Sequence, residues 1–533
     1  MDMGTIESFL SAQHSKGVRL WVEDGQLRYR APKGALAAEE LEEIRTRKAE
    51  LVAYLERTPS VAHLPPFVPQ PRDGGPVPLS HGQERMWSAE RGTAAAPNPC
   101  ALLGFAAIRL RGALDLSVLE RCLTALAQRH EALRTRIPLV DGQPVQMIDD
   151  AASAAICLER VDLCALPEEE REEAVRRHAA AMLRVPIYLA ASAPFRACAF
   201  RLSATDHVVF LWLHHLFGDA WSVAVMRREL AVLYAAFSQG RPSPLPPLPV
   251  QFADYVLWKR KSLDAVLRLH LPYWQAHLAG APPLIVPTDR PRAIVARGDC
   301  EGRPFPFVLP PEPIARLHDL GRQEAATQFM VLFAAFQTLL SAWSGQEDIV
   351  VGVVGARAMA EVQSVVGFCA NYAPTRTDLA GASTFREVLR CVKRASLDAN
   401  EHYYPHIENL PEILRPEQPF CRVQFHLNPS ALRPATGPER TGFADAGIAE
   451  GEFGLELPRY ALYEDLILTL LDGPDGGDGG GMKGWVTYRP DLFDAATVER
   501  FVAGYRACLD GIGAHPDQPL AALIARAREA LRV

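Results

Sequence analysis

A continuous apolar run at residues 208–213 (VVFLWL), followed at once by two histidines, limits the possible folds most strongly. An uninterrupted apolar strand is expected where both faces of a sheet are covered. The run leads through His214 and His215 to Asp219, and residues 221–237 then predict a helix. The chain is therefore expected to form layered sheets covered by helices, in the α/β or α+β class.

The organisation of the chain is indicated by a stretch at residues 59–77 that is rich in proline and glycine. It has no hydrophobic period, and we interpret it as a linker between a small unit, 1–58, and a long remainder. A second, weaker break lies at 239–250. In the remainder, strands are predicted at 105–112, 348–355, 463–471 and 484–489, and helices at 114–131 and 327–343.

The small unit predicts a β-hairpin between helices at 5–14 and 36–56. Apolar residues alternate with polar or larger ones over 18–31 on both sides of Asp24-Gly25, a strong hairpin-turn signal. A lone hairpin leaves its edges unpaired and can accept an extended peptide as an added strand. Arg19, Arg28 and Arg30 would favour an acidic peptide. The alternative is a mini-domain whose arginines are only solvated.

Composition excludes several classes of function. Hydrophobic residues make up 48% and charged residues 22% of the chain, as in soluble globular proteins. The net charge is −7 and no dense basic patch occurs, which argues against nucleic-acid binding. No signal peptide and no apolar run of about 20 residues is present, so no membrane span is expected. None of the ten cysteines forms a CxxC pair, so no metal site is predicted, and a reducing cytoplasm is expected.

The paired histidines suggest chemistry because adjacent side chains of a strand point to opposite faces. His214 and His215 therefore cannot easily chelate one metal. The arrangement suits one structural imidazole and one that faces a cleft and accepts a proton. Asp219 suits a helix N-cap, or it could hold an arginine or order the loop. Taken alone, the HHxxxD pattern favours two core histidines and a capping residue over a catalytic site.

Seven further segments accompany the histidine motif in a recognisable order. HHLFGDAWS at 214–222 resembles the HHxxxDG motif of nonribosomal peptide synthetase condensation domains. The resemblance covers about 78–520 and is carried by PLSHGQERMW (78–87), RHEALRTR (129–136), QFADYVLWKR (251–260), YWQAHLAG (273–280), TQFMVLFAAFQTLLSAWSGQEDIVVG (327–352), VVGFCANYAPTR (365–376) and DLFDAATVERF (491–501). Residues 1–58 separately resemble the TubC-type, or β-hairpin, docking domain.

The resemblance implies two chloramphenicol-acetyltransferase-like lobes, 78–250 and 251–533, in a V-shaped pseudodimer with a tunnel between them. It implies an acyltransferase that moves an acyl group from a carrier-protein phosphopantetheine thioester to an amine or alcohol. The chain itself is expected to bind no cofactor, because the partner carrier supplies the phosphopantetheine arm. The docking domain implies an upstream carrier protein with a short acidic C-terminal motif.

The resemblance also assigns roles to residues. It makes His215 the base or nucleophile-orienting group and His214 structural. It pairs Asp219 with a basic residue, most plausibly Arg357, and places Asn371 near the tunnel. The supporting residues of the motif are Ala220, Trp221 and Ser222. Ala220 departs from the family's glycine, since it adds a methyl group and disfavours a positive φ, and 402–410 departs from the family pattern on the acceptor side.

Several other functions remain to be weighed. The motif is not DxxxxD, which disfavours heterocyclisation, and epimerisation domains follow a carrier on the same chain. A free acyltransferase that uses acyl-coenzyme A would need no docking domain. A degenerate condensation fold could serve as a non-catalytic recruitment platform. The sequence ends at Val533 just after the condensation unit, which is expected either of an excised piece or of a free-standing, chain-releasing enzyme whose acceptor is soluble or carrier-bound.

Overall fold

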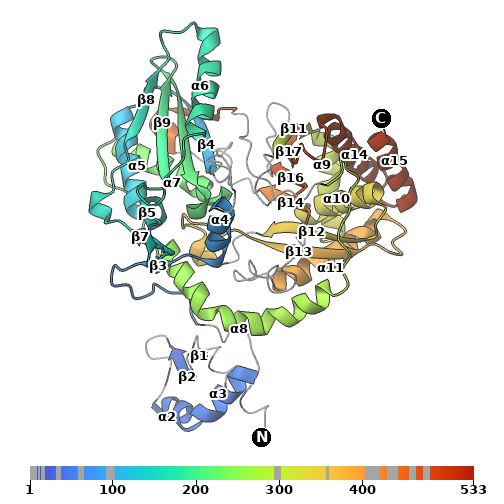
Figure 1. The fold of residues 1–533 in the computed structure, drawn as a ribbon, viewed down its shortest axis with the longest axis horizontal. Helices are drawn as coiled ribbons and strands as arrows, with labels where there is room; N and C mark the ends of the chain where they lie inside the picture. The colour runs from blue at the N-terminus through green and yellow to red at the C-terminus, as the bar shows by residue number, and fades with distance from the viewer. Residues whose placement is uncertain are drawn as a thin grey trace. The chain divides into compact units, whose positions relative to one another are not determined.

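The computed structural model shows two compact units (Figure 1), one formed by Met1–Asp73 with Ala253–Ala279 and the other by Gly74–Phe252 with Gly280–Val533. The structure describes residues 6, 9, 13, 18–23, 25–31, 36, 38–57, 65–91, 103–292, 302–355, 359–402, 421–428, 442–454, 464–471 and 481–532. Helices and sheets both occur in the larger unit, so the mixed α/β class is confirmed.

The predicted hairpin is present in the smaller unit. Strands β1 (Arg19–Glu23) and β2 (Gln26–Arg30) pair antiparallel, and Gly25 in the turn has a φ of 68° that favours glycine. One face of the hairpin packs on two helices, α2 (Ala38–Thr46) and α3 (Lys48–Arg57). The small core is formed by Val18, Leu20, Ile44, Leu51, Tyr54 and Leu55.

Two details of this unit differ from the sequence-based expectation. The helix predicted at 36–56 is interrupted at Arg47, whose guanidinium bonds Glu43 in α2 and Glu50 in α3. Trp21 is buried, as is Leu20 with which it alternates, so the alternation does not divide this strand into a core face and a solvent face. The helix predicted at 5–14 lies largely outside the described residues.

The segment interpreted as a linker is attached to structure over part of its length. The indole of Trp258 in helix α8 (Phe252–Leu278) donates to the carbonyl oxygen of Pro65 at 2.7 Å. Phe67 packs on the same indole with 5.4 Å between ring centroids, and the carboxyl group of Asp254 accepts the backbone N–H of Gln70 at 2.9 Å. Residues 65–70 therefore follow α8 closely, which their proline-rich composition alone does not indicate.

The larger unit contains a five-stranded sheet in the order β15-β4-β10-β9-β8. Its strands are β4 (Leu103–Arg111), β8 (Leu158–Asp162), β9 (Phe195–Arg201), β10 (Asp206–His214) and β15 (Ala449–Glu452), and its helices are α5 (Leu116–Arg129), α6 (Glu168–Leu183) and α7 (Ala220–Phe237). β10 is the central strand, paired with β4 and β9, and is buried from His207 to His214. The apolar run is therefore a strand covered on both faces, as predicted.

A second sheet of six strands has the order β11-β17-β16-β14-β12-β13. Its strands are β11 (Arg303–Leu309), β12 (Asp348–Gly355), β13 (Asn371–Asp378), β14 (Val423–Asn428), β16 (Leu466–Leu471) and β17 (Met482–Tyr488). Helices α9 (Pro311–Gln323), α10 (Gln328–Ser344), α11 (Phe385–Glu401), α14 (Ala495–Ala514) and α15 (Leu520–Arg532) share one large hydrophobic core with it. The described residues of this unit also form α4 (His81–Arg91), the short strands β3 (Val77–Pro78), β5 (Thr135–Arg136), β6 (Leu139–Val140) and β7 (Gln143–Ile148), and 3₁₀ turns at Glu131–Arg134, Ala151–Ser153, His215–Phe217 and Ala360–Val362.

One segment of the C-terminal half joins the N-terminal sheet. β15 pairs with β4, although the sequence places it within the second lobe, 251–533. The short helix α13 (Gly442–Asp445) before it packs on α7, and Arg227 of α7 forms a partly buried ion pair with Glu450 at 3.0 Å. A boundary at residue 250 therefore does not separate the two sheets along the chain.

Gly442 of this crossing segment lies directly against the backbone of α7. A Cβ atom at Gly442 would lie 2.0 Å from the carbonyl oxygen of Ala231, so Gly442→Ala must push α13 away from α7. We expect a loss of about 1–3 kcal/mol in the free energy of unfolding, measured by urea denaturation. Gly451→Ala is the matched control, because a Cβ atom there meets nothing within 4 Å, and equal losses for the two variants would contradict this account.

Candidate functional site

The two histidines lie at the end of β10 in different local structures. His214 is the last residue of the strand, and His215 begins the 3₁₀ turn His215–Phe217. The expectation that both belong to one strand is thus wrong for His215. The Nδ1 atom of the buried His214 accepts the backbone N–H of Leu216 at 3.3 Å and caps this turn.

The imidazole of His215 is held by a backbone carbonyl. Its Nδ1 lies 2.5 Å from the carbonyl oxygen of Gly218. Because a carbonyl oxygen only accepts, Nδ1 carries a proton, and the neutral ring therefore has an unprotonated Nε2. The ring is half-buried and packs edge-on against Phe368, with 5.4 Å between ring centroids. Among the residues that the structure describes, Nε2 has no hydrogen-bond partner.

The charge state of His215 follows from its surroundings. Burial lowers the pKa of His215 below its usual value, against the opposing effects of the Gly218 carbonyl and of Asp219. The ring is therefore neutral at pH 7, and its Nε2 can accept a proton. Gly218 is needed here, since a Cβ atom at this position would lie 2.3 Å from the side chain of Leu213.

Asp219 joins two parts of the larger unit. It is the N-cap of α7, as predicted, and its Oδ1 accepts the backbone N–H of Ser222 at 2.8 Å. Its Oδ2 accepts two backbone N–H groups, from Cys369 at 3.2 Å and from Ala370 at 2.9 Å. The buried carboxyl group thus fixes the backbone just before β13. It also fixes the backbone beside Phe368, which packs on His215.

Neighbouring residues reinforce this connection. The hydroxyl group of Ser222 accepts the N–H of Gly367 at 3.1 Å, and the indole of Trp221 donates to the carbonyl oxygen of Gln363 at 2.7 Å. The buried His130, from the RHEALRTR segment, accepts the N–H of Val366 at 3.4 Å. Segment 363–370 is therefore attached to the first half of the unit at several points.

His130 is itself held by a buried carboxylate. Its Nε2 lies 2.7 Å from Glu229 in α7, which also pairs with Arg129. Burial alone would raise the pKa of Glu229, but the hydrogen bond from His130 and the charge of Arg129 lower it overall. The RHEALRTR segment thus supports the site through structural contacts.

The other candidate residues have varied placements. Ala220 is the first residue of α7 and does not have a positive φ, so the helix start does not require glycine there. Arg357 lies outside the described residues, and its pairing with Asp219 stays a prediction. The backbone of Asn371 begins β13 opposite Gly355. In the docking hairpin, Arg28 and Arg30 are exposed, and Arg19 lies opposite Arg30 in register.

Some contributors could not be predicted from motifs alone. The carbonyl of Gly218 and the amides of Cys369 and Ala370 act through the backbone, which carries no residue-type signal. Only the resemblance of residues 365–376 to a family segment indicates that this part of the chain belongs to the site.

Within the described ranges, no group of three or more possible ligands could hold a metal ion, and no single helix is long and apolar enough to cross a membrane. Helices α9 and α10 satisfy that test only as a pair bent by 110°.

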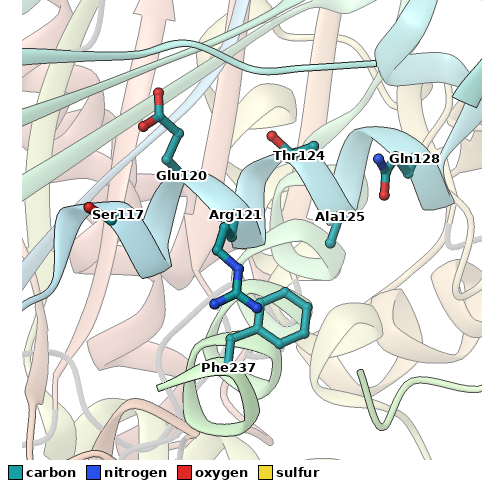
Figure 2. Close-up of a pocket in the computed structure, with 7 residues that line it drawn as sticks. All are labelled: Ser117, Glu120, Arg121, Thr124, Ala125, Gln128 and Phe237. Carbon is teal, nitrogen blue, oxygen red and sulfur yellow. The ribbon is translucent and has the colours of Figure 1, made fainter. Parts of the chain in front are cut away.

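A surface depression of about 330 Å³ lies elsewhere, on α5 (Figure 2). Arg121 projects from α5 over the ring of Phe237 at the end of α7, 5.0 Å from its centroid. The depression is lined by Ser117, Glu120, Arg121, Thr124, Ala125, Gln128 and Phe237. None of these residues belongs to the histidine motif or contacts His215.

Comparisons with known families agree with this geometry. A family model described as Condensation domain matches residues 74–529, and one described as TubC N-terminal docking domain matches residues 6–57. A linear gramicidin synthase polypeptide from Brevibacillus parabrevis is 35% identical over 84% of the chain and 9% of its own length. Phosphinothricin tripeptide synthetase PhsC from Streptomyces viridochromogenes is 32% identical over 92% of the chain and 45% of its own length. The chain therefore spans less than half the length of these relatives.

Solved structures share the fold along their whole length. The X-domain from teicoplanin biosynthesis is 27% identical, with a TM-score of 0.71 over 86% of this chain and 99% of its own. SgcC5 from Streptomyces globisporus, solved with (R)-(-)-1-(2-naphthyl)-1,2-ethanediol and sucrose, is 28% identical, with a TM-score of 0.69 over 83% of this chain and 100% of its own.

Proposed function

The chain belongs to the condensation-domain family, and we propose that it transfers an acyl group from a carrier-protein phosphopantetheine thioester to a soluble amine or alcohol. Condensation domains are acyltransferases that form amide or ester bonds. The observation that carries the proposal is the His215 ring, held as the Nδ1–H tautomer by Gly218 with Nε2 left to accept a proton.

The proposed reaction needs no acyl-enzyme, because a thioester is already activated. His215 Nε2 accepts the proton of the acceptor O–H or N–H as that atom attacks the thioester carbonyl. The C–S bond then breaks and the sulfur leaves as the thiol of the carrier arm, taking up the proton. The products are an ester or amide and the free carrier thiol. Holding both substrates in register supplies much of the acceleration, about 7–11 kcal/mol in favourable cases.

The residues around His215 have positioning roles in this proposal. Asp219 and Ser222 hold segment 367–370, whose Phe368 packs on the His215 ring. His214 stays structural. Arg357 would add a charge beside Asp219, and Asn371 would lie at the tunnel. The match to the docking-domain model supports a carrier partner that binds the β1–β2 hairpin through an acidic C-terminal motif, with Arg19, Arg28 and Arg30 as its contacts.

The proposed alcohol or amine acceptor is supported by SgcC5, which was solved with a small diol and is matched along its whole length. A second candidate function is a non-catalytic recruitment platform. It is favoured by the likeness to an X-domain that was solved as a complex with OxyB, at 27% identity. Catalysis is favoured here because the base-forming tautomer of His215 and the Asp219 connections are both present.

The experiment is to incubate an acyl-loaded carrier protein, ending in an acidic tail, with this protein and a panel of small amines and alcohols. Mass spectrometry of the small products should find the acyl ester or amide of at least one acceptor. Removing the acidic tail should slow its formation. If only a second aminoacyl-carrier accepts the chain, the soluble-acceptor part of the proposal is wrong. If no acceptor is acylated while the tail still binds, the platform function is favoured.

The pH dependence of the reaction tests the role of His215 independently. With an alcohol acceptor, which does not titrate near neutrality, the rate should be constant above pH 7. It should fall as the pH falls through the pKa of His215, because the protonated ring cannot accept a proton. Burial places that midpoint below 6.5. A midpoint above 6.5 in the pH–rate profile would contradict the proposal.

A further inference from the structure

A chain of polar side chains crosses the face of the six-stranded sheet that lies away from the hydrophobic core. In β14, Val423 and Phe425 belong to that core. Because side chains alternate along a strand, Gln424 and His426 point to the other face. The proposed chemistry of His215 makes no use of either side chain.

Hydrogen bonds fix the orientation of each group in this chain. The Nε2 of Gln424 lies 2.6 Å from Oε1 of Glu464, which can only accept as a carboxylate. The amide therefore turns its oxygen toward His426, whose Nε2 lies 2.8 Å from it. That Nε2 must carry the proton, so Nδ1 of the neutral ring is a bare acceptor. Among the described residues, Nδ1 has no hydrogen-bond partner.

The surroundings of His426 set the charge state of its ring. Burial lowers its pKa to about 4, so the ring is neutral at pH 7. The side chain nevertheless keeps partial exposure to solvent. A bare acceptor that is partly exposed can be satisfied only by water or by a ligand group that donates.

The strand register places His426 at the end of the sheet that approaches His215. Gly352 of β12 lies opposite both Gln424 of β14 and Pro374 of β13. Two residues further along, His426 of β14 lies level with Val354 of β12. Val354 in turn pairs with Tyr372 of β13. The Tyr372 position is about 10 Å away, two strand spacings across. Tyr372 follows, by two residues, the amide of Ala370 that Asp219 holds.

We propose that His426 is an acceptor-binding residue, whose Nδ1 accepts a hydrogen bond from a second donor group, such as a hydroxyl, on the molecule that His215 activates. This deepens the proposed function and rests on it. An acceptor-only site favours a hydroxyl or ammonium group over a carboxylate, which would face an unshared lone pair. The substrate class that fits is a small acceptor with a reacting donor and a remote one, as in a diol.

Substitution of Gly352 can displace these side chains while Glu464, Gln424 and His426 themselves stay unchanged. A Cβ atom at Gly352 would lie 2.9 Å from Cγ of Gln424 and 3.0 Å from Cβ of Cys421. Gly352 does not have a positive φ, so alanine suits its backbone. Gly352→Ala should displace the Gln424 side chain and release the ring of His426. Because Gln424 orients the ring of His426, this variant should weaken the hydrogen bond from the acceptor to Nδ1 of His426.

A matched pair of acceptors tests the proposal by kinetics. 1-(2-Naphthyl)-1,2-ethanediol carries a second hydroxyl that 2-(2-naphthyl)ethanol lacks. The wild type should acylate the diol with about tenfold higher kcat/KM than the mono-ol, as for one hydrogen bond to a buried group. His426→Phe should remove the preference, Gly352→Ala should reduce it, and His426→Asn, whose amide oxygen can replace Nδ1, should restore part of it. An unchanged preference in His426→Phe would overturn the proposal.

Binding gives a reading that does not depend on turnover. Nitrogen-15 NMR of the histidine-labelled protein, with the His426 signals identified by their loss in His426→Asn, should show an unprotonated Nδ1 at pH 7. Adding the diol should shift the Nδ1 signal, and adding the mono-ol should not. If no acceptor is acylated at all, the proposed function fails, and this shift still decides the present proposal. No response of His426 to saturating diol would overturn it.

Discussion

Replacement of His215 by alanine is expected to slow acyl transfer from the carrier about 10²- to 10⁴-fold, the usual contribution of a general base. The reason is the loss of Nε2, whose lone pair is left available by the Nδ1–H···O bond to Gly218. The measurement is the initial rate of product formation at saturating acceptor. Substrate positioning remains, so a slow residual rate is expected.

A matched control separates this effect from general damage. His178 in α6 also lies with its Nδ1 against a backbone carbonyl, that of Ala174, at 2.7 Å. His178→Ala should leave the rate within about twofold, because the residue lies far from the motif in sequence and contacts none of its members in the described structure. If His215→Ala retains the wild-type rate, His215 is not the base, and the platform function becomes the better explanation.

Replacement of Asp219 by alanine is expected to cause the largest loss of stability. It leaves the buried N–H groups of Ser222 and Cys369 and the partly buried N–H group of Ala370 without their acceptor. An unsatisfied buried donor costs about 1–3 kcal/mol, so a total loss of about 3 kcal/mol in the free energy of unfolding is expected from urea denaturation. The rate should also fall, since segment 367–370 would no longer hold Phe368 against His215.

Two further variants show which bonds matter. Ser222→Ala keeps the bonds from Cys369 and Ala370 to Asp219, so its loss should be smaller than that of Asp219→Ala. Asp219→Asn keeps the shape but turns an NH₂ group toward one set of donors, so its loss should be intermediate. Equal stability of Asp219→Ala and the wild type would show that the carboxyl group does not connect the two parts. The role of Asp219 would then depend on Arg357.

Features set by local patterns could be predicted from the sequence. The apolar run became the central strand β10 because six successive apolar residues need cover on both faces. Asp219 became an N-cap because a short acidic side chain before an apolar helical pattern can accept its first N–H groups. The Asp24-Gly25 turn similarly predicted the hairpin, since Gly25 adopts the positive φ that such a turn requires.

Features set by contacts between distant segments could not be predicted. The pairing of β15 with β4 joins residues far apart in the chain, and a four-residue strand has no distinctive pattern. Asp219 accepts hydrogen bonds from the backbone N–H groups of Cys369 and Ala370. Backbone groups occur in every residue, so these donors leave no signal in the sequence. His426 lies in a six-residue strand, and the sequence does not show that its Nε2 donates a hydrogen bond to Gln424. The sequence also predicts that the strand includes His215, whereas the strand ends at His214. The 3₁₀ turn that begins at His215 has no clear sequence signal.

The central claim is tested most directly by the intact mass of the acyl-loaded carrier, followed over time with this protein, with and without the naphthyl diol. The account predicts that the carrier loses the acyl mass rapidly only when the diol and an intact His215 are both present, and that the product contains acyl and diol joined with loss of water. Loss of the acyl group at the same rate without the diol, or in His215→Ala, would contradict the claim that His215 directs the acyl chain to a bound acceptor.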